Sequence, residues 1–138
     1  MSGRVLVCGG RHFDDRAFVF GYLDMLSESV VINTIIQGDC PTGADHLARM
    51  WAISRNHHFD SFPANWNAHG RAAGPIRNQR MIDEGRPTMG VAFPGGRGTA
   101  DMVRRLKAAG IAVHEPTAPG FRAIGGEGQF KQTMGERP

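Results

Sequence analysis

The chain contains 138 residues with a formal net charge of +3, and 41% of its residues are hydrophobic. This length predicts one domain with a substantial core, and no apolar run approaches the roughly 20 residues that a membrane-spanning helix requires. The modest charge does not call for a nucleic-acid partner, and the two cysteines, Cys8 and Cys40, form neither a disulfide framework nor a zinc site. We therefore expect a cytoplasmic protein with no metal, no required cofactor and no membrane association.

Apolar runs alternate with helical patterns along the chain. The runs have the length and β-branched content of buried strands, and they cover residues 4–8, 30–36, 58–62, 89–93 and 111–114. The helical patterns cover residues 14–26, 44–55, 75–84 and 99–109. The segment 63–75 is rich in Gly, Asn and Pro, so it is predicted to be a loop, and Pro75 fits the first position of the next helix.

Strands that alternate with helices in this way predict an α/β fold. We expect a single-domain, Rossmann-like, doubly wound and mainly parallel sheet of about five strands, with helices on both faces. The strand order is not readable from the sequence. We assign residues 1–115 to this domain. Residues 116–138 are glycine-rich with few apolar residues, and we expect a tail that is loosely ordered or docks on a partner subunit.

Three glycine-containing turns are predicted at the edge of the sheet where such folds bind ligands: GGRHFDD, GDCPTGAD and PGGRGT. Glycine lets a ligand approach the backbone, and amides at a helix N-terminus attract anions. We therefore interpret PGGRGT as a phosphate-binding turn. The alternative is a purely structural turn in which Thr99 caps the helix. The candidate ligand-binding residues in the three turns are Gly9, Gly10, Arg11, Gly38, Asp39, Gly43, Asp45, Pro94, Gly95, Gly96, Arg97, Gly98 and Thr99.

Two acidic residues and one arginine are candidates for chemistry. Asp45 follows Thr42 by three residues, as in a capping box, and it is also a candidate catalytic carboxylate. Asp39 ends the second strand, where it can accept a hydrogen bond from a ribose hydroxyl or a base. Arg77 and Asn78 open a predicted helix, where an arginine opposes the helix dipole, which favours a role for Arg77 at the ligand edge. Both are candidate ligand-binding residues.

Four ordered motifs make the chain resemble the SLOG superfamily of Rossmann-like proteins, which includes the Lonely Guy phosphoribohydrolases and the DNA-processing protein DprA. The motifs are GGRHFDD, GDCPTGADHLARMWA, PANWNAHGRAAGPIRNQRM and AFPGGRGTADMVRRLKAAGI, within a match from about Val5 to Val113. The chain looks closest to the YspA-like, cpYpsA-related branch. The resemblance implies a SLOG-type sheet that binds a nucleotide or nucleotide-derived molecule and, by analogy, a homodimer.

The resemblance also implies where catalysis would occur. In the Lonely Guy enzymes an arginine works with the glutamate of PGGxGTxxE to cleave the N-glycosidic bond of a nucleoside 5′-monophosphate. Arg77 matches that arginine, but Met102 stands in the place of the glutamate. Glycosidic cleavage requires a carboxylate for proton transfer or charge stabilisation, which a thioether cannot provide.

These observations favour a protein that binds or senses a small nucleotide-derived ligand, such as a nucleoside phosphate or an ADP-ribose-like molecule. The alternative is a phosphoribohydrolase that uses a different carboxylate, with Arg77, Asp39 and Asp45 as the catalytic candidates. DprA-like nucleic-acid binding is a lesser alternative, because the sequence lacks a lysine-rich stripe or a row of stacking aromatic residues.

Overall fold

The computed structural model describes residues 3–117 and contains a five-stranded sheet in the order β3-β2-β1-β4-β5. All four pairs of neighbouring strands are parallel. The strands are β1 (Gly3–Cys8), β2 (Ile32–Gln37), β3 (His58–Ser61), β4 (Met89–Ala92) and β5 (Val113–His114). The helices are α1 (Arg16–Ser29), α2 (Gly43–Ser54), α3 (Trp66–His69), the 3-10 turn η1 (Gly70–Ala72), α4 (Ala73–Asp83) and α5 (Arg97–Ala108).

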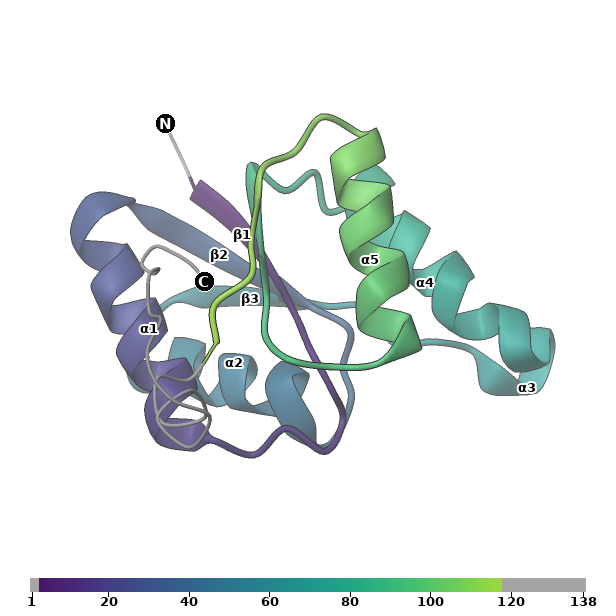
Figure 1. Cartoon of the computed structure of the whole chain (residues 1–138), viewed down its shortest axis with the longest axis horizontal. Helices are drawn as coiled ribbons and strands as arrows, with labels where there is room; N and C mark the ends of the chain where they lie inside the picture. Colours follow the sequence, from purple (N-terminus) through teal and green to yellow (C-terminus); the bar gives the residue numbers. More distant parts are fainter. Residues whose placement is uncertain (1–2, 118–138) are drawn as a thin grey trace, which may run out of the picture.

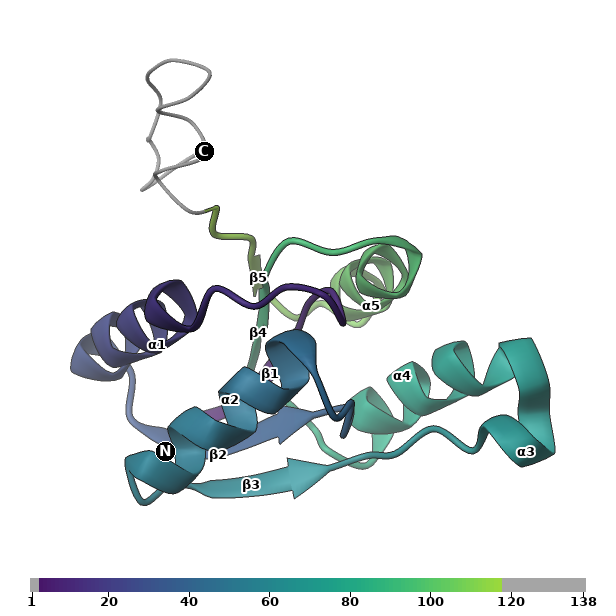
Figure 2. The same cartoon turned by 90° about the horizontal axis from the view of Figure 1, so that it is seen from below.

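The predicted α/β fold with a parallel sheet and helices on both faces is confirmed. Helices α1 and α2 cover one face and α4 and α5 cover the other (Figures 1 and 2). Side chains of β1 alternate between two apolar cores: Val5 and Val7 pack with α1 and α2, whereas Leu6 and Cys8 pack with α4 and α5. This period of two is the normal consequence of strand geometry, and it makes β1 the shared wall of both cores.

Local boundaries differ from the predictions where side chains cap helices. The predicted loop 63–75 contains α3 and η1, because the Asn65 side chain accepts a hydrogen bond from Ala68 N at 3.0 Å and caps α3. Helix α4 then begins at Ala73, so Pro75 is its third residue and not its first. The predicted tail, 116–138, lies outside the described residues from position 118 onward. Within residues 3–117, no helix combines the length and apolar character needed to cross a bilayer.

The order of the strands places a topological switch point between β1 and β4. The chain runs outward from β1 through β2 to β3 and then returns to pair β4 with the other side of β1. Ligands of doubly wound sheets bind beyond the carboxyl ends of the strands at such a point. The turns that follow β1, β2 and β4 all lie at that edge.

Backbone contacts lock these three turns together. Gly10 N donates to Pro94 O at 2.9 Å, and Ala44 N donates to Gly10 O at 3.1 Å. The Thr42 hydroxyl donates to Arg11 O at 2.8 Å. Segments that are more than 30 residues apart in the sequence therefore share one hydrogen-bonded edge.

The contact between Gly43 and the first turn gives a testable prediction. Gly43 has a φ of 73°, and an added Cβ would lie 2.5 Å from the Cα atom of Arg11 and against Gly10 O. We expect Gly43→Ala to lower the free energy of unfolding by about 2–4 kcal/mol, from the left-handed backbone and the clash together. Urea unfolding measures this loss.

The matched control is Gly110→Ala. Gly110 has a φ of 78° but no atom within 4 Å of an added Cβ, so this variant carries only the backbone term of about 1–2 kcal/mol. Equal losses in the two variants would show that the turns do not pack against each other at Gly43.

Candidate functional site

The N-terminus of α5 lies in the PGGRGT turn and has unsatisfied backbone donors. Gly96 occupies the capping position without a side-chain hydrogen bond, and the first bond of the helix runs from Ala100 N to Gly96 O at 3.0 Å. The N–H groups of Arg97, Gly98 and Thr99 have no acceptor among residues 3–117. Thr99 is the third helical residue, so the interpretation of Thr99 as the helix cap is wrong. Such exposed amides at a positive helix end favour an anion.

The glycines of the turns divide into two groups. An added Cβ at Gly95 would lie 2.7 Å from Gly10 N, and one at Gly9 would lie 2.6 Å from the Ala44 Cβ. These glycines are required by the contacts between the turns. At Gly96 and Gly98, no atom lies within 4 Å of an added Cβ, and both residues are exposed. At this second group the glycines are not required by contacts between the turns, and their backbone is exposed.

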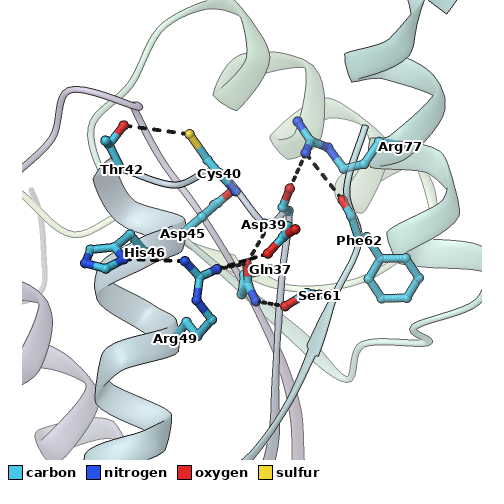
Figure 3. Close-up of polar contacts among 11 residues, drawn as sticks. Gln37, Asp39, Cys40, Thr42, Asp45, His46, Arg49, Ser61, Phe62 and Arg77 are labelled. Carbon is cyan, nitrogen blue, oxygen red and sulfur yellow. Dashed lines mark hydrogen bonds and ion pairs between the residues drawn. The ribbon is translucent and has the colours of Figure 1, made fainter. Parts of the chain in front are cut away.

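Arg77 extends from α4 to the carboxyl ends of β2 and β3 (Figure 3). Its Nη1 donates to Gly38 O at 2.6 Å and to Phe62 O at 3.5 Å, and its Nε donates to Asn78 Oδ1 at 3.1 Å. Its Nη2 group has no hydrogen-bond partner in the described part of the chain. Arg77 therefore brings a positive charge and free donors to the edge that carries the turns.

Asn78 connects α4 to the glycine turn. It is 5% exposed, and its Nδ2 donates to Gly98 O at 3.3 Å and to Asp101 Oδ2 at 3.0 Å. Together with the bond from Arg77, these contacts use both ends of the Asn78 amide. The geometry makes Asn78 a positioning residue for Arg77 and for the start of α5. Direct contact of Asn78 with a ligand stays a prediction.

Asp45 is a buried carboxyl beneath the β2–α2 turn. It is 9% exposed, and its Oδ2 accepts a hydrogen bond from Cys40 N at 3.3 Å. Burial raises the pKa of Asp45 above its usual value, although Arg77 and the backbone N–H groups of Cys40 and Gly38 act to lower it. The predicted capping box is wrong. The Asp45 carboxylate accepts from Cys40 N, and the Thr42 hydroxyl donates to Arg11 O and makes no capping hydrogen bond with α2.

Cys8 ends β1 next to this carboxyl. Burial, reinforced by the negative charge of Asp45, raises the pKa of Cys8 to about 12. The thiol therefore stays protonated near neutral pH and is a poor nucleophile. Within residues 3–117, no group of three or more His, Cys, Asp or Glu side chains is arranged to hold a metal ion.

Asp39 belongs to a polar network whose other members the sequence analysis missed. Gln37 is fully buried, and its Oε1 accepts from Asp39 N at 2.6 Å and from Arg49 Nη1 at 3.4 Å. Arg49 Nη1 also donates to Asp39 Oδ1 at 3.3 Å (Figure 3). A glutamine that ends an apolar strand is the sequence signal for this network, since a buried amide requires partners.

Met102 points into the core between α5 and the sheet. It is 1% exposed and packs with Leu6, Ile36 and Leu106. The neighbouring Asp101 does not replace the missing glutamate. Burial acts to raise its pKa, but hydrogen bonds from Arg105 and Asn78 hold the pKa of Asp101 below its usual value. The Asp101 carboxylate therefore accepts from Asn78 of α4 and pairs with Arg104 and Arg105 of its own helix.

Two surface hollows, of about 420 Å³ and about 510 Å³, share Arg80 as a lining residue. Neither is lined by a residue of the three turns; the lining residues come from segments 63–67 and 72–83 and from Arg105. The candidate site therefore rests on the convergence of polar groups at the sheet edge and not on a deep cavity.

Comparisons with known proteins place the chain in a family. The model of the YspA, cpYpsA-related SLOG family matches residues 3–69. Gene 61 protein of Mycobacterium phage D29 is 37% identical over 118 residues, which cover 80% of this chain and 93% of the relative. The chain belongs to the YspA, cpYpsA-related SLOG family.

The family match includes the first two turns of the candidate site. It ends at residue 69 of this chain, so the PGGRGT turn lies outside the match. Membership of the SLOG family associates the chain with binding or processing of a nucleotide-related ligand. Among solved structures, the C-terminal domain of a hydrogenase from Pyrococcus furiosus is similar, with 16% identity and a TM-score of 0.45, covering 83% of this chain and 91% of that one.

The buried position of Met102 gives a testable prediction about the family glutamate. We expect Met102→Glu to lower the free energy of unfolding at pH 7 by about 4 kcal/mol, because the new carboxyl must be protonated or left charged in an apolar core. Met102→Leu, of similar volume, is the matched control and is expected to lose less than about 1.5 kcal/mol. A stable Met102→Glu variant in chemical denaturation would contradict the inward orientation of position 102.

Proposed function

We propose that this protein binds a small nucleotide-derived ligand whose phosphate lies at the N-terminus of α5. The observation that carries the proposal is the pair of open glycines, Gly96 and Gly98, beside three unsatisfied N–H groups. A phosphate can approach this backbone, accept from several amides and gain from the helix dipole. The exposed side chains of Arg11 and Arg97 add positive charge from two of the turns.

The remaining polar groups support a ligand larger than a phosphate ion. Arg77, with its free Nη2, lies toward the ends of β2 and β3, and Asp39 lies at the end of β2. Neighbouring strands are about 4.8 Å apart, so a ligand that spans the ends of β4, β1 and β2 has room for a sugar beside its phosphate. The SLOG family association with nucleotide-related ligands agrees with this arrangement.

Thermal unfolding with a panel of nucleoside monophosphates, nucleoside diphosphates and ADP-ribose tests the proposal. A ligand present at a hundred times its Kd is expected to add about 2.7 kcal/mol to the free energy of unfolding, which raises the Tm by several degrees. Gly96→Val is expected to weaken that binding at least tenfold, because the new side chain covers the exposed amides. No stabilisation by any member of the panel would reject the proposal.

Gly21→Val provides the matched control. Gly21 lies in α1, and no atom lies within 4 Å of an added Cβ there or at Gly96. Both variants are therefore expected to keep a Tm near that of the wild type without ligand, and only Gly96→Val is expected to lose affinity. Equal affinity of the two variants for the best ligand would reject the α5 site.

Hydrolysis of an N-glycosidic bond is a second candidate function, favoured by the raised pKa of Asp45. A carboxyl that stays protonated nearer to neutral pH can donate a proton to the base as the N-glycosidic bond breaks. Water then adds to the sugar carbon and returns a proton to the carboxylate. Arg77 and Asp45 both approach Gly38, where an added Cβ would lie 2.6 Å from Arg77 Nη1 and 2.9 Å from Asp45 Oδ2. The Arg77 guanidinium and a carboxyl with a raised pKa therefore lie near each other, which supports Asp45 as the candidate acid.

Release of free base from nucleoside 5′-monophosphates, followed by chromatography, tests this second function. If Asp45 is the acid, Asp45→Asn is expected to lower the rate by about 10²–10⁴ while ligand binding persists. Base release that persists at the wild-type rate in Asp45→Asn would exclude Asp45. The absence of release from the wild type, with binding intact, would leave the binding function alone.

A further inference from the structure

Trp66 exposes a large apolar side chain at the start of α3. Neither α3 nor η1 contains a buried residue, and α3 lies beyond the sheet, next to the start of α4 (Figures 1 and 2). Trp66 is 51% exposed, whereas Trp51, the other tryptophan of the chain, is 1% exposed. Packing within residues 3–117 therefore leaves much of Trp66 without a partner.

The indole of Trp66 is nevertheless held in one position. The Asn65 side chain caps α3 by accepting from Ala68 N, and Asn65 O accepts from His69 N at 3.0 Å. The Cη2 atom of the ring lies 3.5 Å from the position that a Cβ of Gly74 would occupy, so the ring edge rests on the first turn of α4. An aromatic surface that is fixed before binding loses little conformational entropy when a flat ring stacks on it.

A hollow of about 510 Å³ adjoins the indole, within the range of roughly 300–1,000 Å³ for small-molecule sites. Its lining residues are Pro63, Ala64, Asn65, Trp66, Asn67 and Arg80. The exposed amide of Asn67 has two donors and an acceptor but no hydrogen-bond partner among residues 3–117. Unstacked nucleobases bind to aromatic rings and guanidinium groups and form hydrogen bonds along their edges. The hollow therefore suits a planar heterocycle with polar edges.

The charge around the hollow favours a ligand that is also an anion. Segment 61–82 contains three arginines and no aspartate or glutamate. Arg80 pairs with Glu84, but Arg71 is exposed without an ion-pair partner in the described part of the chain, and Arg77 keeps its Nη2 group free. Such a surplus of cations raises the local concentration of anions. A nucleotide combines a planar heterocycle with negative charge and matches both properties.

The hollow lies within reach of the N-terminus of α5. Gly74, which Trp66 contacts, and Asn78 are about one turn apart on α4, and Asn78 Nδ2 donates to Gly98 O at 3.3 Å. Together these steps place the indole no more than about 15 Å from Gly98 O. A nucleoside diphosphate or an ADP-ribose-like molecule spans such a distance better than a monophosphate does.

We propose that Trp66 stacks on the base of a nucleotide-derived ligand whose phosphates extend to the N-terminus of α5. The proposal rests on the proposed function and adds the site of the base, so the ligand is a nucleoside diphosphate or a molecule that contains one. Trp66 supplies the stacking surface, Asn67 contacts the polar edge of the base, and the arginines of segment 61–82 attract the phosphates.

Fluorescence titration with ADP, ADP-ribose and pyrophosphate tests the proposal directly. Trp51 is buried and donates to Asp24, so Trp66 is the tryptophan that a ligand can reach. ADP and ADP-ribose are expected to quench the fluorescence of the wild type, whereas pyrophosphate, which has no base, binds without quenching. Trp66→Phe is expected to remove the quenching and to keep the affinity for ADP within about threefold, since phenylalanine also stacks.

Trp66→Ala separates binding of the base from binding of the phosphates. Calorimetry is expected to show ADP affinity weakened about tenfold or more, the range for loss of stacking between a base and an aromatic side chain, with pyrophosphate affinity within about twofold of the wild type. Gly96→Val is expected to weaken binding of both ligands. Ile76→Ala is the matched control, because Ile76 is 41% exposed and lines the other hollow, and it is expected to bind ADP as the wild type does.

The outcomes distinguish the two proposals. If neither ADP nor pyrophosphate binds the wild type, both the phosphate site and the base site are rejected. If both bind but Trp66→Ala binds ADP as tightly as the wild type, the phosphate site stands and the base site is rejected. If ADP binding depends on Trp66 but not on Gly96, the base site stands and the α5 site is rejected. A single-stranded oligonucleotide that quenches Trp66 at a lower concentration than ADP would assign the indole to nucleic-acid bases and overturn the proposal.

Discussion

The candidate site depends on the two hydrogen bonds that the backbone of Gly10 makes. Its N–H donates to Pro94 O in the turn after β4, and its carbonyl accepts from Ala44 N in the first turn of α2. An added Cβ would lie 3.1 Å from Pro94 O, so the residue has little space for a side chain. One peptide segment therefore fixes the position of the PGGRGT turn relative to the β2–α2 turn with Asp39 and to the start of α2 with Asp45.

Backbone contacts fill the space between the three turns, so the backbone groups that remain exposed lie at the start of α5. Gly9, Gly43 and Gly95 are needed where chain segments meet, whereas Gly96 and Gly98 face open space. The same residue type thus serves packing at some positions and leaves backbone accessible at others. The distinction depends on what lies opposite each Cα atom, which no turn sequence specifies.

The sequence predicted what depends on periodicity and missed what depends on neighbours in space. Alternating runs were sufficient for a doubly wound parallel sheet. The helix-dipole argument for Arg77 was wrong in its premise, because α4 begins at Ala73 and Arg77 is its fifth residue, beyond the first turn. Arg77 nevertheless extends to the carboxyl ends of β2 and β3, and its role toward a ligand stays a prediction. The capping box at Thr42 failed because Arg11 O, 31 residues away in the chain, competes for the hydroxyl. The roles of Gln37 and Arg49 require the packing of β2 against β3 and α2.

The carboxylates at this edge favour ligand binding over cleavage, because two of the three are paired with arginine side chains. Asp101 is neutralised by Arg104 and Arg105, and Asp39 is paired with Arg49. Asp45 has a raised pKa, yet its Oδ2 accepts from Cys40 N, one residue beyond Asp39. Proton transfer at Asp45 is therefore coupled to the turn that holds Asp39. Binding of an anion at the N-terminus of α5 requires no change in that turn, because the free N–H groups at the start of the helix already face solvent.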